Sequence, residues 1–273
     1  MNGGIVSLSL TDLALASCLI LALSSLSLAM GLGLVRSLII AALRTVLQLL
    51  LIGLVLKAVF AQSNPLWVFI IALIMLLVAG REVMARQQRP FLGWWGPGLG
   101  TAAMFISSFS ITIFVLFFVV QVKPWYTPQY AIPLLGMMLG NTMNGIALGL
   151  DRLTQQAWQQ RAVIDARLAL GQEPALAIAD IRRESVRTGL IPMINAMAAA
   201  GIVSLPGMMT GQILAGVDPV VAVNYQVLIM FMVTAGTGFG TIAAIVLGAR
   251  RLFDERQRLR LERLKGGGEF YQD

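Results

Sequence analysis

The sequence predicts an all-α polytopic membrane protein with about seven transmembrane helices, and three observations support this fold class. Of its 273 residues, 58% are hydrophobic and only 12% are charged, whereas a soluble domain has about 25% charged residues. The hydrophobic residues gather in runs near the roughly 20 residues that a helix needs to cross a bilayer. These runs also lack the alternating pattern of the roughly 10-residue strands that form membrane barrels.

Seven apolar runs are the expected spans, with bounds near 11–35, 38–60, 65–80, 98–121, 129–150, 188–215 and 219–249. The first is not expected to be a cleaved signal peptide, because no Lys or Arg precedes Arg36. Three spans are expected to open with an N-cap residue followed by proline. These starts are Asn64-Pro65, Thr127-Pro128 and Asp218-Pro219.

The basic residues predict the orientation of the spans. Of the 20 Lys and Arg residues, all but Lys57 and Lys123 fall in loops on one face of the seven-span arrangement. The positive-inside rule then places the N-terminus outside and the C-terminus in the cytoplasm. The topology accounts for the basic residues behind the net charge of +7, which are spread over several loops. Nucleic-acid binding is therefore not expected.

A single permease domain with four parts is expected: spans 1–5 in 1–150, cytoplasmic coupling helices in 151–188, spans 6 and 7 in 189–250, and a basic cytoplasmic tail in 251–273. In the coupling segment, one helix is expected over 151–171, ending at Gly171, and a second from Pro174 to about Thr188. Arg161 and Asp165 have the spacing of an i,i+4 ion pair. The pair of helices would either lie on anionic lipid or dock a partner.

The expected spans carry no carboxylate near mid-membrane, and the chain has no histidine. Proton-coupled transporters normally use such groups, so proton-driven transport is disfavoured. The chain also lacks the G-x-x-x-x-G-K-[ST] motif, so it is not expected to bind ATP, to be an enzyme or to hold a cofactor. Any ATP and Mg²⁺ would belong to a separate ATPase subunit. A heptahelical receptor and a carrier of a small solute that does not use ATP remain alternatives.

Polar residues inside the spans are candidates for a substrate path. Asn141 and Asn144 share one face of the fifth span, where contact with lipid would leave their amides unpaired. They are expected to face other helices, either as a hydrogen-bonding clamp or as path-lining groups. Arg44 and Gln48 share a face of the second span, where Arg44 would either extend to the membrane surface or face an anionic substrate. The remaining candidates for the path are Asn195 and Gln212.

Small and sulfur-containing residues raise two further possibilities. The G-x-x-x-G spacing allows close helix approach and occurs at Gly136/Gly140, Gly145/Gly149, Gly207/Gly211 and Gly236/Gly240. Intrachain packing explains any one of them, and their number favours a homodimer.

The 14 methionines favour either soft-metal transport or flexible packing, and no metal is assigned. They include Met137, Met138, Met143, Met193, Met197, Met208 and Met209.

Several strings resemble a known family. "DARLALG" (165–171) is a partial match to the E-A-A-x-x-x-G opening of the loop by which many ABC permeases contact their ATPase. "PLLGMMLGNTMNGIALGLDRL" (133–153), "LALGQEP" (168–174), "RRESVRTGLIPMINAM" (182–197) and the segment 203–231, which contains "SLPGMMTG", are similar to the FetB-type iron-export permease family. Its plant relatives are implicated in aluminium tolerance. The segment 42–60 is similar to the family's second span.

This resemblance implies the membrane subunit of an ABC transporter in the plasma (cytoplasmic or inner) membrane. It would export iron or another metal or metal complex as a homodimer with a cytosolic ATPase. The residues expected to couple it to the ATPase are Asp165, Arg167, Gly171, Arg183 and Arg187. The chain departs from the family at Asn195 and Ala196, because members can carry Asp within an I-P-x-[IV]-[DN]-S string.

Overall fold

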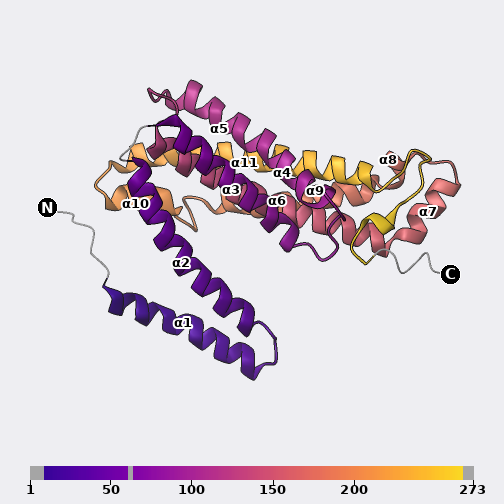
Figure 1. Ribbon diagram of the computed structural model, residues 1–273, viewed down its shortest axis with the longest axis horizontal. Coiled ribbons are helices and arrows are strands. Elements are labelled where there is room, and N and C mark those ends of the chain that lie inside the picture. The colour runs from indigo at the N-terminus through magenta and orange to yellow at the C-terminus, as the bar shows by residue number, and fades with distance from the viewer. Residues whose placement is uncertain (1–8, 61–63, 267–273) are drawn as a thin grey trace. The chain divides into compact units, whose positions relative to one another are not determined.

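A computed structural model describes residues 9–60 and 64–266. The regular structure of these residues is helical (Figure 1). The chain divides into two compact units. Unit 1 comprises Met1–Asn64 and Gly211–Val217, and unit 2 comprises Pro65–Thr210 and Asp218–Asp273.

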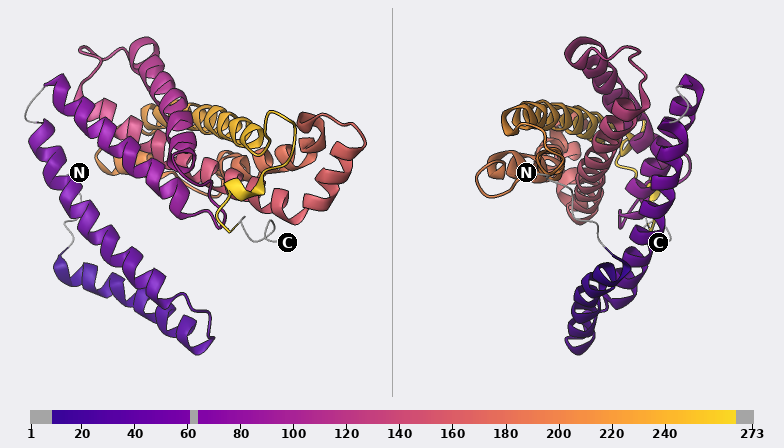
Figure 2. Two further views of the ribbon diagram at one scale, coloured as in Figure 1. Left: turned by 45° about the vertical axis from the view of Figure 1, so that its right-hand side comes forward. Right: turned by 90° about the vertical axis from the view of Figure 1, so that its left-hand side faces the viewer.

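Unit 1 contains a helical hairpin formed by α1 (Leu10–Ala29) and α2 (Val35–Phe60), which is visible in Figure 2. Ser9 begins α1 with a capping box, in which its hydroxyl accepts from Asp12 N–H and its own N–H donates to the Asp12 carboxylate. Gly31 and Gly33 in the turn have φ of 64° and 69°, a conformation that favours glycine. Most side chains of both helices are exposed and apolar, as lipid-facing helices require.

Unit 2 contains four helical segments that are long and apolar enough to cross a membrane. They are α3 (Pro65–Ala85), the run Trp95–Val120, α6 (Pro128–Gln159) and α11 (Pro219–Arg251). The run Trp95–Val120 consists of α4 (Trp95–Met104), the π-helix η1 (Phe105–Phe109), α5 (Ser110–Phe114) and the π-helix η2 (Val115–Val120). Together with α1 and α2, the described residues contain six helices that are long and apolar enough to cross a membrane. The all-helical prediction is therefore confirmed.

The predicted sixth span, 188–215, is not one continuous helix. It comprises the end of α9 (Ala179–Ala199), a turn over 200–206 and α10 (Gly207–Leu214). Gly201 has a φ of 81°, and Pro206 disfavours helical backbone in the residue before it, so the helix cannot continue through the turn. The seventh crossing stays a prediction.

The helix bounds predicted for the coupling segment were wrong in two places. The helix α6 passes Asp151 without a break and ends at Gln159, and α7 (Arg161–Ala169) follows a kink at Gln160. Pro174 opens only the short α8 (Pro174–Ala177), after which α9 runs without interruption into the predicted sixth span. Gly171 does end the α7 region, with a φ of 84°.

The three predicted helix starts are confirmed, because α3, α6 and α11 all begin at their prolines. Their N-caps differ in chemistry. The Asp218 carboxylate accepts from the backbone N–H groups of Val220 (2.9 Å) and Val221 (3.3 Å). Thr127 does not cap α6 with its side chain, and its hydroxyl donates instead to the Pro124 carbonyl at 2.5 Å.

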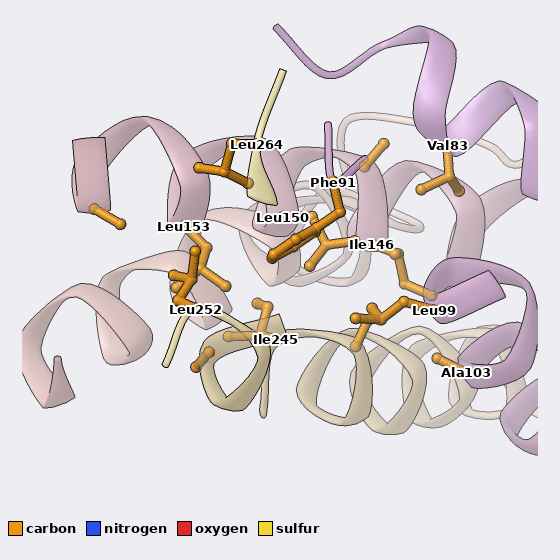
Figure 3. Close-up of a cluster of buried hydrophobic side chains, with 14 of the residues drawn as sticks. Val83, Phe91, Leu99, Ala103, Ile146, Leu150, Leu153, Ile245, Leu252 and Leu264 are labelled. Atoms are coloured by element: carbon orange, nitrogen blue, oxygen red, sulfur yellow. The ribbon is translucent and has the colours of Figure 1, made fainter. Parts of the chain in front are cut away.

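The core of unit 2 includes the chain that follows α11. Figure 3 shows side chains from α3, α4, α6 and α11 converging with Phe91 and Leu264. Although the sequence predicts a basic tail here, Leu259, Leu261 and Leu264 are buried. Backbone hydrogen bonds join this segment to the α3–α4 loop, at Leu92 N–H to Arg263 O (2.8 Å) and Lys265 N–H to Pro90 O (3.0 Å). Residues 252–266 are therefore an integral part of unit 2.

Candidate permease site

The amides of Asn141 and Asn144 have different partners. Asn144 Oδ1 accepts a hydrogen bond at 2.5 Å from Nη1 of Arg86, which follows α3. Asn141 Nδ2 donates at 2.8 Å to the Met137 carbonyl of its own helix. Asn144 is exposed and bonded to the residue that follows α3, whereas Asn141 is half-buried and satisfied within α6.

Asp151, at the end of the same run, extends this junction. Its Oδ1 accepts from the backbone N–H of Gln88 at 2.8 Å, and its Oδ2 accepts from Gln155 Nε2 at 2.6 Å. The carboxylate therefore ties α6 to the segment after α3. Asn144 and Asp151 together connect α6 to the residues that follow α3, through hydrogen bonds from the Arg86 side chain and the Gln88 backbone.

Glycines set the close packing of α6, α9 and α11. A Cβ on Gly189 of α9 would lie 2.5 Å from the Gly145 carbonyl of α6, and a Cβ on Gly145 would lie 2.6 Å from Thr237 Cγ2 of α11. Such distances leave no room for a side chain. The role of Gly189 in packing is not apparent from the sequence, because its partner is on another helix and no G-x-x-x-G spacing marks it.

The predicted glycine pairs divide into two groups. Gly236 and Gly240 are used within the chain, because a Cβ at Gly236 would clash with Met138 and one at Gly240 would lie 2.6 Å from Thr142 Cγ2. Among the described residues, no atom lies within 4 Å of a Cβ built at Gly140, Gly207 or Gly211. A Cβ at Gly136 would meet only Met75, at 3.1 Å. Gly140 and Gly207 are therefore the predicted packing glycines of unit 2 that have no close neighbour among the described residues.

Buried hydroxyls gather where η1, α6 and α11 meet. Ser108 Oγ and Thr142 Oγ1 are 3.4 Å apart. The hydroxyls of Ser107, Thr237 and Thr241 are buried without a hydrogen-bond partner among the described residues. This polar layer was not among the predicted sites. The Ser and Thr residues that recur in the apolar runs are the sequence feature that indicates it. Among the described residues there is no group of three or more His, Cys, Asp or Glu that could hold a metal ion.

The predicted coupling residues lie on α7, its C-terminal turn and α9. Arg167 Nη1 donates to the Ala177 carbonyl at 3.0 Å, and its Nη2 pairs with Asp180 at 3.1 Å. Asp165 pairs with Arg161 at 3.4 Å, as its spacing predicts. Arg167 therefore holds α7 against α8 and α9, while Arg183 and Arg187 are exposed, one turn apart on α9.

The other predicted path residues belong to different units. Arg44 and Gln48 are exposed on α2, and Gln212 is half-buried on α10, all in unit 1. Asn195 is exposed on α9 in unit 2. Asn141 and Asn144 share α6, and Arg44 and Gln48 share α2, whereas Asn195 and Gln212 lie on two further helices.

A charged turn and a cavity lie beside the coupling segment. The backbone N–H of Arg258 donates to Asp254, and this bond, with those from the Arg258 and Arg260 side chains, lowers the pKa of Asp254 to about 2. A cavity of about 430 Å³ lies between this turn, α8, α9 and the end of α11. Its lining includes Glu173, Arg182, Arg250 and Gln257.

Comparison with known proteins assigns the family. Residues 10–253 match the family described as "Uncharacterised protein family (UPF0014)". A UPF0014 membrane protein of Synechocystis sp. is 39% identical over 84% of this chain and 88% of its own length. The "Probable iron export permease protein FetB" of Escherichia coli is 32% identical over 81% and 83%, and "Protein ALUMINUM SENSITIVE 3" of Arabidopsis thaliana is 32% identical over 81% and 79%.

No solved structure matches the chain. The family match covers nearly the whole described chain, and its six candidate spans agree with relatives that are named as membrane proteins. The chain is therefore a multi-pass membrane protein that belongs to the UPF0014 family.

Proposed function

We propose that this chain is the membrane subunit of an ABC transporter that exports iron, or another metal or metal complex, in the plasma membrane. The observation that carries this proposal is the similarity to a relative named as a probable iron export permease, which extends over 81% of this chain. The strings around the α6 and α9–α10 regions, which carry the resemblance, also build the close-packed centre of unit 2.

The proposed topology has seven crossings, with the N-terminus outside and the C-terminus in the cytoplasm. In this topology the sixth crossing is discontinuous, formed by the end of α9, the turn 200–206 and α10. Without that crossing, α11 would run outward and place Arg250, Arg251 and the arginines that follow them outside the cell. The positive-inside rule opposes such an arrangement.

The energy for export would come from a separate cytosolic ATPase. The four membrane-length helical segments of unit 2 carry no carboxylate in their central turns that could harvest a proton gradient. The helix α9 is a mechanical candidate for coupling, because one unbroken helix joins the Arg167 clamp to the close contact at Gly189. Movement at α7–α8 would reach the centre of unit 2 through it, with Pro192 as a bend point.

The decisive experiment expresses this chain with a candidate P-loop ATPase encoded beside it. The two proteins should copurify, and inverted vesicles that contain both should accumulate radioactive iron only with ATP. An ATPase variant without its P-loop lysine is the matched control. If no ATPase binds the chain, or ATP leaves metal movement unchanged for iron and other metals, the proposal is wrong.

A further inference from the structure

A second cavity, of about 420 Å³, lies beside α11. The end of α9, the turn 200–206, the start of α10 and one face of α11 form its walls. Three of the 14 methionines line it, namely Met197, Met209 and Met230. The lining of this cavity does not depend on whether the chain exports iron.

The turn 200–206 brings these methionines together from distant parts of the sequence. Gly201 N–H donates to the Ser204 carbonyl at 2.9 Å, and Ser204 N–H donates to the Ala199 carbonyl at 3.1 Å. The chain therefore reverses within a few residues and places Met209 opposite the end of α9. Met197 is further held by Thr234, whose hydroxyl donates to its sulfur at 2.9 Å.

Gln226 provides a second, independent sign that the cavity holds a ligand. It lies one turn before Met230 on α11, lines the cavity and is only 8% exposed. Its Oε1 is buried and has no hydrogen-bond partner among the described residues. A buried amide oxygen without a partner costs free energy, and a bound cation would supply the missing interaction.

The chemistry of the lining selects the class of cation. Thioethers are soft ligands and favour Cu(I) over harder ions. The ligand set is neutral, so it cannot offset the loss of hydration of a bare divalent or trivalent ion. We propose that Met197, Met209 and Met230, with Gln226 Oε1 beside them, bind a soft monovalent metal ion of the Cu(I) and Ag(I) class.

The backbone around the cavity fits this role in the proposed topology. The turn 200–206 interrupts the sixth crossing, and irregular backbone at membrane depth is tolerated where it is buried in protein or lines a cavity. Discontinuous membrane helices commonly border ion and substrate sites. The string "SLPGMMTG" supplies Leu205, Pro206 and Met209 to the lining.

Silver ion is the probe for the test, because it has the softness of Cu(I) without its redox chemistry. The full chain in detergent carries Cys18→Ser throughout, because Cys18 is the single thiol of the sequence and a thiolate binds silver strongly. Binding is measured by equilibrium dialysis of silver nitrate in chloride-free buffer. The test variants are Met209→Leu and the double variant Met197→Leu with Met230→Leu, because such swaps nearly conserve volume and preserve the fold.

Met208→Leu is the matched control, because Met208 adjoins Met209 but does not line the cavity. We expect one tight Ag⁺ per chain, weakened about tenfold or more by Met209→Leu and unchanged by Met208→Leu. Excess Fe²⁺ should not displace it.

The proposal would be overturned if all variants bound Ag⁺ as tightly as the parent protein. It would also be overturned if Fe²⁺ displaced Ag⁺, or if Met208→Leu weakened Ag⁺ binding as much as Met209→Leu. Gln226→Leu should weaken Ag⁺ binding while the protein elutes unchanged in gel filtration. A failure of silver binding with ATP-driven iron export intact would remove this site and leave the proposed function in place.

Discussion

Arg167 of α7 forms an ion pair with Asp180 of α9, with Nη2 and Oδ2 3.1 Å apart. The same guanidinium donates to the Ala177 carbonyl, so one side chain joins three helices of the coupling segment. The sequence predicts Arg167 as a contact for the ATPase. In the structure its guanidinium also holds these helices together, and the contact with an ATPase stays a prediction.

We expect Arg167→Glu to uncouple ATP hydrolysis from transport while the protein remains folded, because an exposed pair contributes only about 0.2–1 kcal/mol to stability. ATPase stimulation in proteoliposomes measures the effect. The swap of Arg167→Asp with Asp180→Arg should restore part of the stimulation. If Arg167→Glu stimulates as well as the wild type, the clamp has no role in coupling.

Gly171→Val should reduce coupling, because Gly171 has a φ of 84° and left-handed backbone costs other residues about 1–2 kcal/mol. Space is not the obstacle, since no described atom lies within 4 Å of a Cβ built there. Gly171→Asn is the matched control, because asparagine tolerates this conformation. Comparable losses of ATPase stimulation in both variants would show that backbone conformation is not the cause.

Gly140→Leu should weaken a homodimer without destabilising the single chain, because the space around Gly140 is open within the described residues. Light scattering of the purified complex in mild detergent measures the assembly. Gly189→Ala should do the reverse and lower stability by about 1–3 kcal/mol through overpacking against Gly145. A Gly140→Leu protein that dimerises normally would exclude α6 from the interface at this point.

Reporter fusions should be active in the cytoplasm after Asp273 and outside when placed in the 122–127 loop. A fusion after Val217 should also report the outside, because α9, the turn and α10 together would then complete the sixth crossing. Activity of the Val217 fusion in the cytoplasm, with the other two as expected, would mean that 188–215 does not cross the membrane. Five crossings would then precede α11 instead of six, which contradicts the proposed topology.

The Asp254 turn should resist acid. Its pKa in the folded protein is about 2, below the ordinary value of 3.8, so its stabilising effect is complete above about pH 4 and is lost as the pH falls through 2. Pepsin cleavage in 252–266 should therefore accelerate near pH 2 relative to a linear peptide of the same sequence. At neutral pH, Asp254→Asn should speed trypsin cleavage after Arg256, whereas Glu255→Gln should not.

The sequence by itself determined the helical membrane class, the spans outside 188–215 and the helix starts at Pro65, Pro128 and Pro219. These features depend on local composition, because a bilayer requires long apolar helices and proline fits the first turn of a helix. The ion pair of Arg161 with Asp165 was predictable for the same reason, since helix geometry alone brings i and i+4 together.

Only the tertiary structure decided which polar groups meet. Asn144 pairs with Arg86, Arg167 pairs with Asp180, and Met209 and Met230 line one cavity. The tertiary structure also shows that Gly236 packs against other helices of the chain, whereas Gly140 does not. It shows in addition that residues 252–266 return to the core of unit 2. Such contacts join residues from different helices, so their geometry depends on helix crossing and chain reversal, which local periodicity does not encode.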